Sequence, residues 1–96
     1  MAYKLLTTNQ FEKDLKRCKK RGLPMDKLKE VIHELVANGQ VSTCFKPHRL
    51  HGNRAGQWEC HIQPDWLLIW EQNNTELTLL MLNTGTHSDL FGKTKR

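Results

Sequence analysis

The chain has 96 residues, of which 38% are hydrophobic and 26% are charged, and its formal net charge is +5. This composition is typical of one small globular domain and excludes a disordered chain. No apolar run reaches the length of a membrane span, and the N-terminus lacks the apolar region of a secretion signal, so we expect a cytoplasmic protein without a membrane partner.

The positive charge is concentrated in the first half. Residues 1–50 hold eleven Lys and Arg against five Asp and Glu, whereas residues 51–96 hold four against five. The densest run is Lys16–Arg21. Such a run can be a solvated helix face, but the net charge favours a surface that binds phosphate groups.

The first half predicts one strand and two helices. Residues 2–6 form a short apolar stretch that is typical of a strand. A helix follows, with Thr8 or Asn9 as its N-cap and Gly22 at its end. Its apolar positions recur at helical spacing: Phe11, Leu15 and Cys18. The basic residues then form an exposed ridge on the other faces: Lys13, Lys16, Arg17, Lys20 and Arg21.

A second helix is predicted after a short turn. Pro24 suits its first turn and Asn38-Gly39 suits its end. Its buried stripe consists of Leu28, Val31, Ile32, Leu35 and Val36. Because the connection is short, we expect the two helices to pack as an antiparallel hairpin.

The second half predicts consecutive strands. Apolar or mixed segments at 57–62, 66–70 and 76–82 are separated by turn residues at Pro64-Asp65 and Asn73-Asn74. Short turns between consecutive strands indicate an antiparallel meander. The predicted fold is α+β, a small twisted antiparallel sheet with the helical hairpin packed on one face. Residues 1–92 would form this domain, and 93–96 a basic tail.

Four of the five histidines lie at position 48 or beyond: His48, His51, His61 and His87. His61 and Asp65 flank a predicted tight turn, and His87 follows the last strand. Functional side chains concentrate at such strand ends. Each candidate residue also has an ordinary structural explanation. Trp66 and Trp70 share a strand face and fit the hydrophobic core, and Phe91 could close the C-terminal end of that core.

Cleavage of RNA without a metal ion fits this set of residues. The ribose 2′-hydroxyl attacks the adjacent phosphate when a base removes its proton and an acid protonates the leaving 5′-oxygen. Groups that titrate near neutrality suit both tasks, and cations stabilise the charge on the phosphate. Structural zinc needs four ligands and usually paired ones. His48 and His51 have a possible pair spacing, but Cys60 and His61 alternate to opposite faces of a strand. The candidate ligands would be Cys44, His48, His51, Cys60, His61 and His87. We therefore expect no metal and no cofactor, and free thiols at the cysteines.

Three motifs resemble one known family. They are His48-Arg-Leu-His-Gly52, His61-Ile-Gln-Pro-Asp65-Trp66-Leu-Leu-Ile-Trp70 and Thr84-Gly-Thr-His87-Ser-Asp-Leu-Phe91-Gly. In this order they resemble the YafQ-type toxins of the RelE/ParE superfamily, which are ribosome-dependent mRNA endonucleases of bacterial toxin–antitoxin pairs. The resemblance extends over nearly the whole chain and implies a small twisted antiparallel sheet with two N-terminal helices.

The resemblance also implies roles in RNA cleavage. His87 would be a principal general acid or base with Asp65 as its complement, while His48 and His61 would share proton transfer or stabilise the phosphate. Trp66 and Phe91 would shape the pocket or stack on nucleotides. Lys46 and Arg49 would contact phosphate, and the basic ridge would touch ribosomal RNA. His51 beside His48 leaves open which imidazole works there.

A toxin of this family implies a cognate antitoxin, typically in a heterotetramer that binds operator DNA through the antitoxin. Its other partners would be the ribosome and mRNA. Two alternatives remain at this point: a ParE-like inhibitor of DNA gyrase without nuclease chemistry, and an RNA-binding module without catalysis.

Overall fold

A five-stranded sheet with two long helices on one face makes up residues 2–92, the part of the chain that the computed structural model describes. The strands are β1 (Lys4–Thr7), β2 (His48–Arg49), β3 (Gln57–Gln63), β4 (Trp66–Asn73) and β5 (Thr78–Gly85). The helices are α1 (Asn9–Lys20), α2 (Met25–Asn38) and a short α3 (His87–Phe91), and two single 3₁₀ turns, Thr43–Phe45 and Gly52–Arg54, flank β2. The predicted tail at 93–96 lies outside the described residues.

The sheet has the order β1-β5-β4-β3-β2. Neighbours from β2 to β5 are antiparallel, which agrees with the predicted meander. β1 instead pairs with β5 in parallel, with Lys4 opposite Thr78, so the sheet is mixed. Along the sequence, both long helices and three strands separate β1 from β5, so no short turn fixes the direction of β1 relative to β5. The predicted α+β class with helices on one face is confirmed.

Each long helix begins or ends at a residue that the sequence singled out. The Thr8 hydroxyl accepts a hydrogen bond from the backbone N–H of Phe11 at 3.0 Å and caps α1. Gly39 ends α2 with φ +72°, and a Cβ at this position would lie 2.6 Å from the ring of Tyr3. Glycine is therefore required there both for the backbone angle and for the close approach of the ring.

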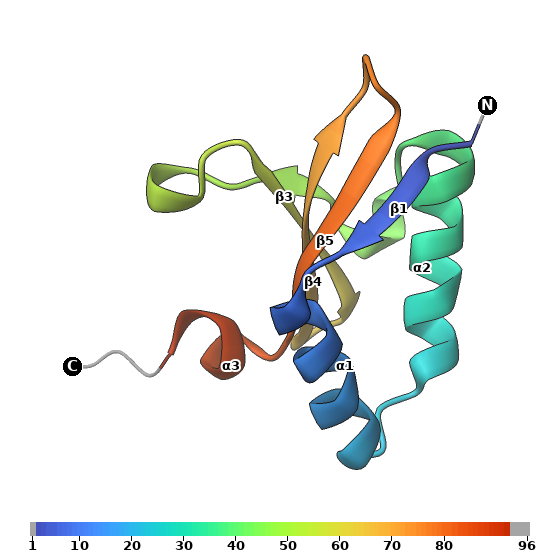
Figure 1. Cartoon of the computed structure of the whole chain (residues 1–96). Coiled ribbons are helices and arrows are strands. Elements are labelled where there is room, and N and C mark those ends of the chain that lie inside the picture. The colour runs from blue at the N-terminus through green and yellow to red at the C-terminus, as the bar shows by residue number, and fades with distance from the viewer. Residues whose placement is uncertain (1, 93–96) are drawn as a thin grey trace.

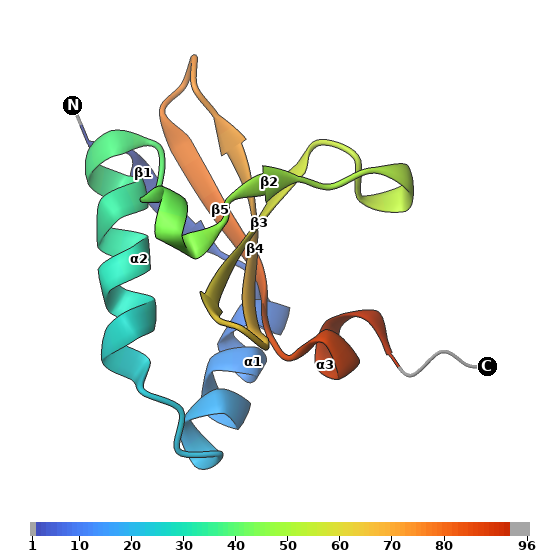
Figure 2. The same cartoon turned by 180° about the vertical axis from the view of Figure 1, so that it is seen from behind.

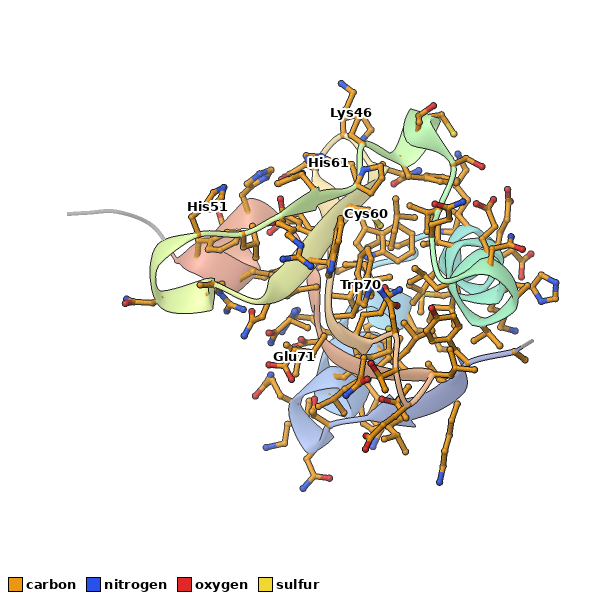
Figure 3. All side chains as sticks on the ribbon, turned by 90° about the horizontal axis from the view of Figure 1, so that it is seen from above. Lys46, His51, Cys60, His61, Trp70 and Glu71 are labelled. Carbon is orange, nitrogen blue, oxygen red and sulfur yellow. The ribbon has the colours of Figure 1, made fainter. Side chains whose placement is uncertain are left out.

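The core lies between the sheet and these helices. Figures 1 and 2 show α1 and α2 running in opposite directions from their connecting turn, with α3 projecting away from them at the other side. The buried cluster contains these residues: Phe11, Cys18, Leu28, Val31, Leu35, Val41, Cys60, Ile62, Trp66, Leu68, Trp70, Leu79 and Met81. In Figure 3, Cys60 and Trp70 lie on the α2 side of the sheet and Glu71 on the other. Both sides of β4 are nevertheless buried from Trp66 to Trp70, and the strand becomes partly or fully exposed only from Glu71 onward.

The two hairpin connections differ from one another. Pro64-Asp65 forms the predicted tight turn between β3 and β4. The β4–β5 connection is longer than the predicted two-residue turn, because the side chain of Asn73 accepts hydrogen bonds from the backbone N–H of Thr75 and Glu76. β5 consequently begins at Thr78 and extends to Gly85, which brings its end to the start of α3.

Across residues 2–92, no helix has both the length and the apolar character needed to cross a membrane.

Candidate active site

Four rings from three separate segments form a row along one end of the sheet. The centroids of His48 and His61 are 6.2 Å apart, those of His61 and His87 are 5.9 Å apart, and those of His87 and Phe91 are 6.3 Å apart. β2 supplies the first ring, β3 the second and α3 the last two. The structure therefore brings together the three histidines that the sequence placed at strand ends.

Asp65 orients His87. One carboxylate oxygen of Asp65, Oδ1, accepts hydrogen bonds from His87 Nδ1 at 2.8 Å and from the His87 backbone N–H at 3.1 Å. The side-chain hydrogen bond from His87 is the main reason that the pKa of Asp65 is lowered from its ordinary value. An ionised Asp65 holds the proton on Nδ1 and leaves Nε2 of His87 available to a substrate.

Glu59 lies between the other two imidazoles. Its Oε1 is 3.0 Å from His48 Nε2 and 4.0 Å from His61 Nε2. Glu59 was not among the residues predicted from the sequence, although its spacing from His61 is one signal that the sequence carries. Glu59 and His61 are two apart on β3 and therefore share a face, and Glu59 pairs with His48 in the β2–β3 register.

Arg54 is a second residue that sequence reasoning missed. Its guanidinium lies 5.4 Å from the ring centroid of Phe91 and donates a hydrogen bond to Gln57 at 2.9 Å. It belongs to the connection between β2 and β3, where no motif singled it out. A cation stacked on an aromatic ring beside the histidines can bind a phosphate group.

Known proteins share this architecture over the whole described chain. The family model for YafQ, a bacterial toxin of type II toxin–antitoxin systems, matches residues 3–92. The chain belongs to this family. The mRNA interferase toxin YafQ of Escherichia coli strain K12 is 37% identical over 86 residues, which cover 88% of this chain and 91% of the relative. The family assignment made from the three motifs is thereby confirmed.

Two solved structures show the same fold. The E. coli DinJ–YafQ toxin–antitoxin complex contains a chain with a TM-score of 0.86 and 33% identity, and the match covers 96% of this chain and 100% of that one. A metal-bound toxin from Helicobacter pylori has a TM-score of 0.84 and 34% identity, with coverage of 95% and 100%. The structural likeness thus extends across the family beyond one organism.

Trp66 cannot act as a stacking surface in this YafQ-family chain. It is only 1% exposed, and its Nε1 donates a hydrogen bond to the Thr84 hydroxyl at 2.9 Å, which in turn donates to the carbonyl of Leu67. Of the two roles predicted for Trp66, stacking on a nucleotide is contradicted by this burial, whereas shaping the pocket stays a prediction. Phe91 is exposed and remains available for stacking.

The residues of the basic ridge of α1 have two different environments: the two arginines have partners within the protein, and the lysines are exposed. Arg21 binds both carboxylate oxygens of Asp89 on α3, at 2.6 and 3.1 Å. Arg17 contacts the buried Asp14 at 3.1 Å and donates a hydrogen bond to the carbonyl of Thr84 at 3.0 Å. The ribosome contacts predicted for Arg17 and Arg21 therefore compete with these internal partners. Lys13, Lys16 and Lys20 are exposed.

The Arg21–Asp89 pair also holds α3 in place. Asp89 accepts a hydrogen bond from the backbone N–H of Thr86, and the Thr86 hydroxyl accepts one from the backbone N–H of Asp89, which together form a capping box at the start of α3. The pKa of Asp89 is lowered from 3.8 to about 2, and the largest cause is the side-chain hydrogen bond from Arg21. Because His87 is the first residue of α3, this ion pair links α1 to the position of the imidazole.

The remaining predicted residues lie around the row. Lys46 and Arg49 are exposed next to His48, and the Arg49 guanidinium lies 5.1 Å from the ring of Trp58. A pocket of about 280 Å³ opens beside His61 and is lined by Cys44, Phe45, Lys46, His61, Ile62, Gln63 and Pro64. His51 is exposed on the β2–β3 connection, apart from His61, as Figure 3 shows. His48 rather than His51 therefore joins the row.

Proposed function

We propose that this chain is the toxin of a type II toxin–antitoxin pair and an endoribonuclease that cleaves translated mRNA on the ribosome, through attack of the ribose 2′-hydroxyl on the adjacent phosphate. The chain's membership of the YafQ family supports its assignment as a toxin and as an endoribonuclease, since the curated relative is named an mRNA interferase. The hydrogen-bonded Asp65–His87 pair beside His61 is the observation that carries the chemistry.

The reaction requires two proton transfers. A base takes the proton of the 2′-hydroxyl while its oxygen forms a bond to phosphorus, and the bond from phosphorus to the 5′-oxygen breaks as an acid protonates that oxygen. The products are a 2′,3′-cyclic phosphate and a 5′-hydroxyl. His87, oriented by Asp65, supplies one of these groups, and His48 or His61 the other. Arg54 beside Phe91, and Lys46 and Arg49 next to His48 in the chain, stabilise the charge on the phosphoryl oxygens.

The openness of the site suits a polymer substrate. The side chains of His87 and Asp65 are 56% and 67% exposed, so a strand can reach both without a conformational opening. Phe91 follows His87 by one helical turn and offers an exposed ring on which a base can stack. A cationic surface on α1 would then bind ribosomal RNA through Lys13, Lys16 and Lys20.

A cognate antitoxin is part of this proposal, because the E. coli family member is known in a complex with DinJ. The expected assembly is a heterotetramer in which the antitoxin binds operator DNA. Inhibition of DNA gyrase, the alternative function, is not favoured, since a binding inhibitor does not require oriented histidines.

The test uses a purified translation system and an mRNA whose cleavage site has been mapped. Replacing the ribose at that site by 2′-deoxyribose removes the nucleophile and should abolish cleavage at that position only, while the unmodified transcript yields 2′,3′-cyclic phosphate ends. Cleavage of the deoxy-substituted transcript at the same rate would refute the 2′-hydroxyl mechanism. Gyrase inhibition by the wild type without any cleavage would establish the alternative.

A further inference from the structure

Two charged side chains of α1 hold the backbone of Thr84 near the end of β5. One carboxylate oxygen of Asp14, Oδ2, accepts a hydrogen bond from the Thr84 backbone N–H at 3.1 Å, and Arg17 Nη2 donates one to the Thr84 carbonyl at 3.0 Å. The two side chains also bind each other, with 3.1 Å between Arg17 Nη1 and Asp14 Oδ1. This closed set of contacts, the Asp14–Arg17 clamp, fixes a residue that lies shortly before His87 in the chain.

The clamp takes the place of a neighbouring strand. β1 pairs with β5 only from Thr78 to Met81, and the chain then enters α1. Thr84 is fully buried, so its backbone N–H and its carbonyl need partners within the protein. Asp14 and Arg17 supply both partners. The end of β5 therefore takes its position on this edge from side chains of α1.

Stability alone does not explain why the clamp is ionic. Asp14 is 1% exposed, and a buried ion pair often stabilises a fold no more than a hydrophobic pair of the same volume would. Charged groups add direction, because the planar guanidinium of Arg17 binds the carboxylate and the carbonyl at the same time. The side-chain amides of Gln10 at 2.9 Å and Asn83 at 3.4 Å fix the carboxylate itself. The clamp thus defines where the end of β5 lies.

Thr84 is also tied to the strand that follows Asp65. Its hydroxyl donates a hydrogen bond to the carbonyl of Leu67 at 2.7 Å and accepts one from Trp66 Nε1 at 2.9 Å. Trp66 and Leu67 come directly after Asp65 in the chain. The residue that the clamp holds therefore connects the segment of Asp65 with the segment of its partner, His87.

The path from the clamp to His87 has little freedom. A Cβ at Gly85 would lie 2.7 Å from Arg17 Nη2 and 2.8 Å from Asp89 Oδ2, so both side chains pack against this peptide. Arg17 Nε also lies 3.5 Å from Asp89 Oδ2, which accepts the hydrogen bond from the backbone N–H of Thr86 in the capping box. A shift of the clamp would therefore move the start of α3.

We propose that Asp14 and Arg17 are positioning residues for RNA cleavage, which set the end of β5 so that His87 Nδ1 meets Asp65. Asp14 cannot touch RNA, because it is buried, so its effect on cleavage passes through His87. This effect rests on the proposed function, whereas the effect on the imidazole does not. Loss of the clamp should change both the tautomer of His87 in the free protein and the chemical step on the ribosome.

The first experiment measures the imidazole ¹⁵N shifts of His87 in the full chain without RNA at about pH 8, above the ordinary histidine pKa of about 6.5. The shifts should place the proton of the wild-type ring on Nδ1, where Asp65 accepts it. Asp14→Asn keeps the shape and loses the charge, and Arg17→Lys keeps the charge and loses the planar fork. Both variants should lose this preference and show a mixture of the two tautomers.

Two control variants separate this effect from general destabilisation. Glu12→Gln removes an exposed carboxylate from the same helix. Gln72→Ala removes a hydrogen bond of 2.7 Å to the carbonyl of Gly39, at the other end of β4, and should lower the free energy of unfolding. Both control variants should keep the wild-type shifts of His87, because neither belongs to the clamp.

The second experiment separates binding from chemistry in the purified translation system. For Asp14→Asn the single-turnover cleavage rate at saturating protein should fall by roughly 10- to 100-fold, since a misplacement of about 1 Å can cost about 10²-fold. The protein concentration that gives half the maximal rate should stay unchanged, because a buried carboxylate makes no contact with the ribosome.

Wild-type ¹⁵N shifts of His87 in both folded variants, or a wild-type cleavage rate in Asp14→Asn, would overturn the proposal. Failure of both variants to fold would overturn it as well, because the clamp would then serve the fold as a whole. If Asp14→Asn alone fails to fold, the shifts and the rate of Arg17→Lys decide in the same way. Failure of the proposed nuclease function looks different: the wild type would cleave no transcript, while the tautomer of His87 would still change in the variants.

Discussion

The carboxylate of Asp65 holds His87 at two points, the ring Nδ1 at 2.8 Å and the backbone N–H at 3.1 Å. Two bonds to one oxygen fix both the start of α3 and the direction of the imidazole. An ionised carboxylate accepts and does not donate, so the proton stays on Nδ1 and Nε2 faces outward. Orientation of one histidine by one carboxylate is thus the central feature of the site.

Asp65→Asn should lower the single-turnover cleavage rate by about 10²-fold or more, the usual contribution of a positioned acid or base. The amide can present its NH₂ group to Nδ1, which favours the other tautomer and removes the outward-facing base. Thermal unfolding should change little, since Asp65 is exposed. Asp26→Asn, an exposed carboxylate at the start of α2, is the matched control. A wild-type rate in Asp65→Asn would contradict this role.

Acid should release the ion pair that anchors α3. The pKa of Asp89 is lowered from 3.8 to about 2, mainly by the hydrogen bond from Arg21, so its stabilising contribution is present above about 3.8 and is lost as the pH falls toward 2. Asp89→Asn should lack this acid dependence and lose about 1 kcal/mol of unfolding free energy at pH 7, because the partner Arg21 is 45% exposed and solvent screens the pair.

Urea unfolding of both proteins at several pH values between 2 and 7 measures this difference (about the range over which carboxylates titrate). Glu76→Gln, an exposed carboxylate in the β4–β5 loop, controls for general charge effects. Parallel curves for the wild type and Asp89→Asn down to the lowest pH would show that the ionisation of Asp89 does not stabilise the fold.

The three thiols should differ sharply in reactivity. Burial raises the pKa of Cys60 to about 12 and also raises the pKa of Cys18, whereas Cys44 is exposed. Because the thiolate is the reactive form, iodoacetamide at pH 8 should alkylate Cys44 alone in the folded protein and all three cysteines in urea. Peptide mass spectrometry after timed quenching reads out the sites. Equal labelling of Cys60 and Cys44 without denaturant would contradict the described core.

The exposed lysines of α1 should carry the ribosome contact. Lys16→Gln/Lys20→Gln should weaken binding to ribosomes and make the dependence of log affinity on log salt shallower by about one for each lysine that contacts a phosphate. Lys27→Gln/Lys29→Gln removes the same charge from exposed positions of α2 and should have a smaller effect. Equal losses in the two double variants would mean that net charge alone, and no particular surface, attracts the ribosome.

Local chemistry explains which parts of the fold the sequence could predict. The Thr8 cap, the end of α2 at Gly39 and the Pro64-Asp65 turn depend on neighbours in the chain, and the structure has all three. The parallel pairing of β1 with β5 depends on residues more than 70 positions apart, such as Lys4 and Thr78, and no local signal indicates it.

The same distinction applies to the site. His48, His61 and His87 were found because short motifs surround them, and their convergence follows from the ends of adjacent strands. Glu59 was missed because a lone acidic residue in a strand has no motif, and its importance arises only when β2 pairs with β3. The internal partners of Arg17 and Arg21 depend on the packing of α1 against β5 and α3, which a run of basic residues does not reveal.

The most direct measurement is a map of cleavage sites on translated mRNA for the wild type and His87→Ala, with circular dichroism and antitoxin binding to establish that the variant is folded. The wild type should produce fragments with 2′,3′-cyclic or 3′-phosphate ends, and the folded variant should lose cleavage by about 10² to 10⁴-fold, the range for a general acid or base. Undiminished cleavage by His87→Ala would contradict the account.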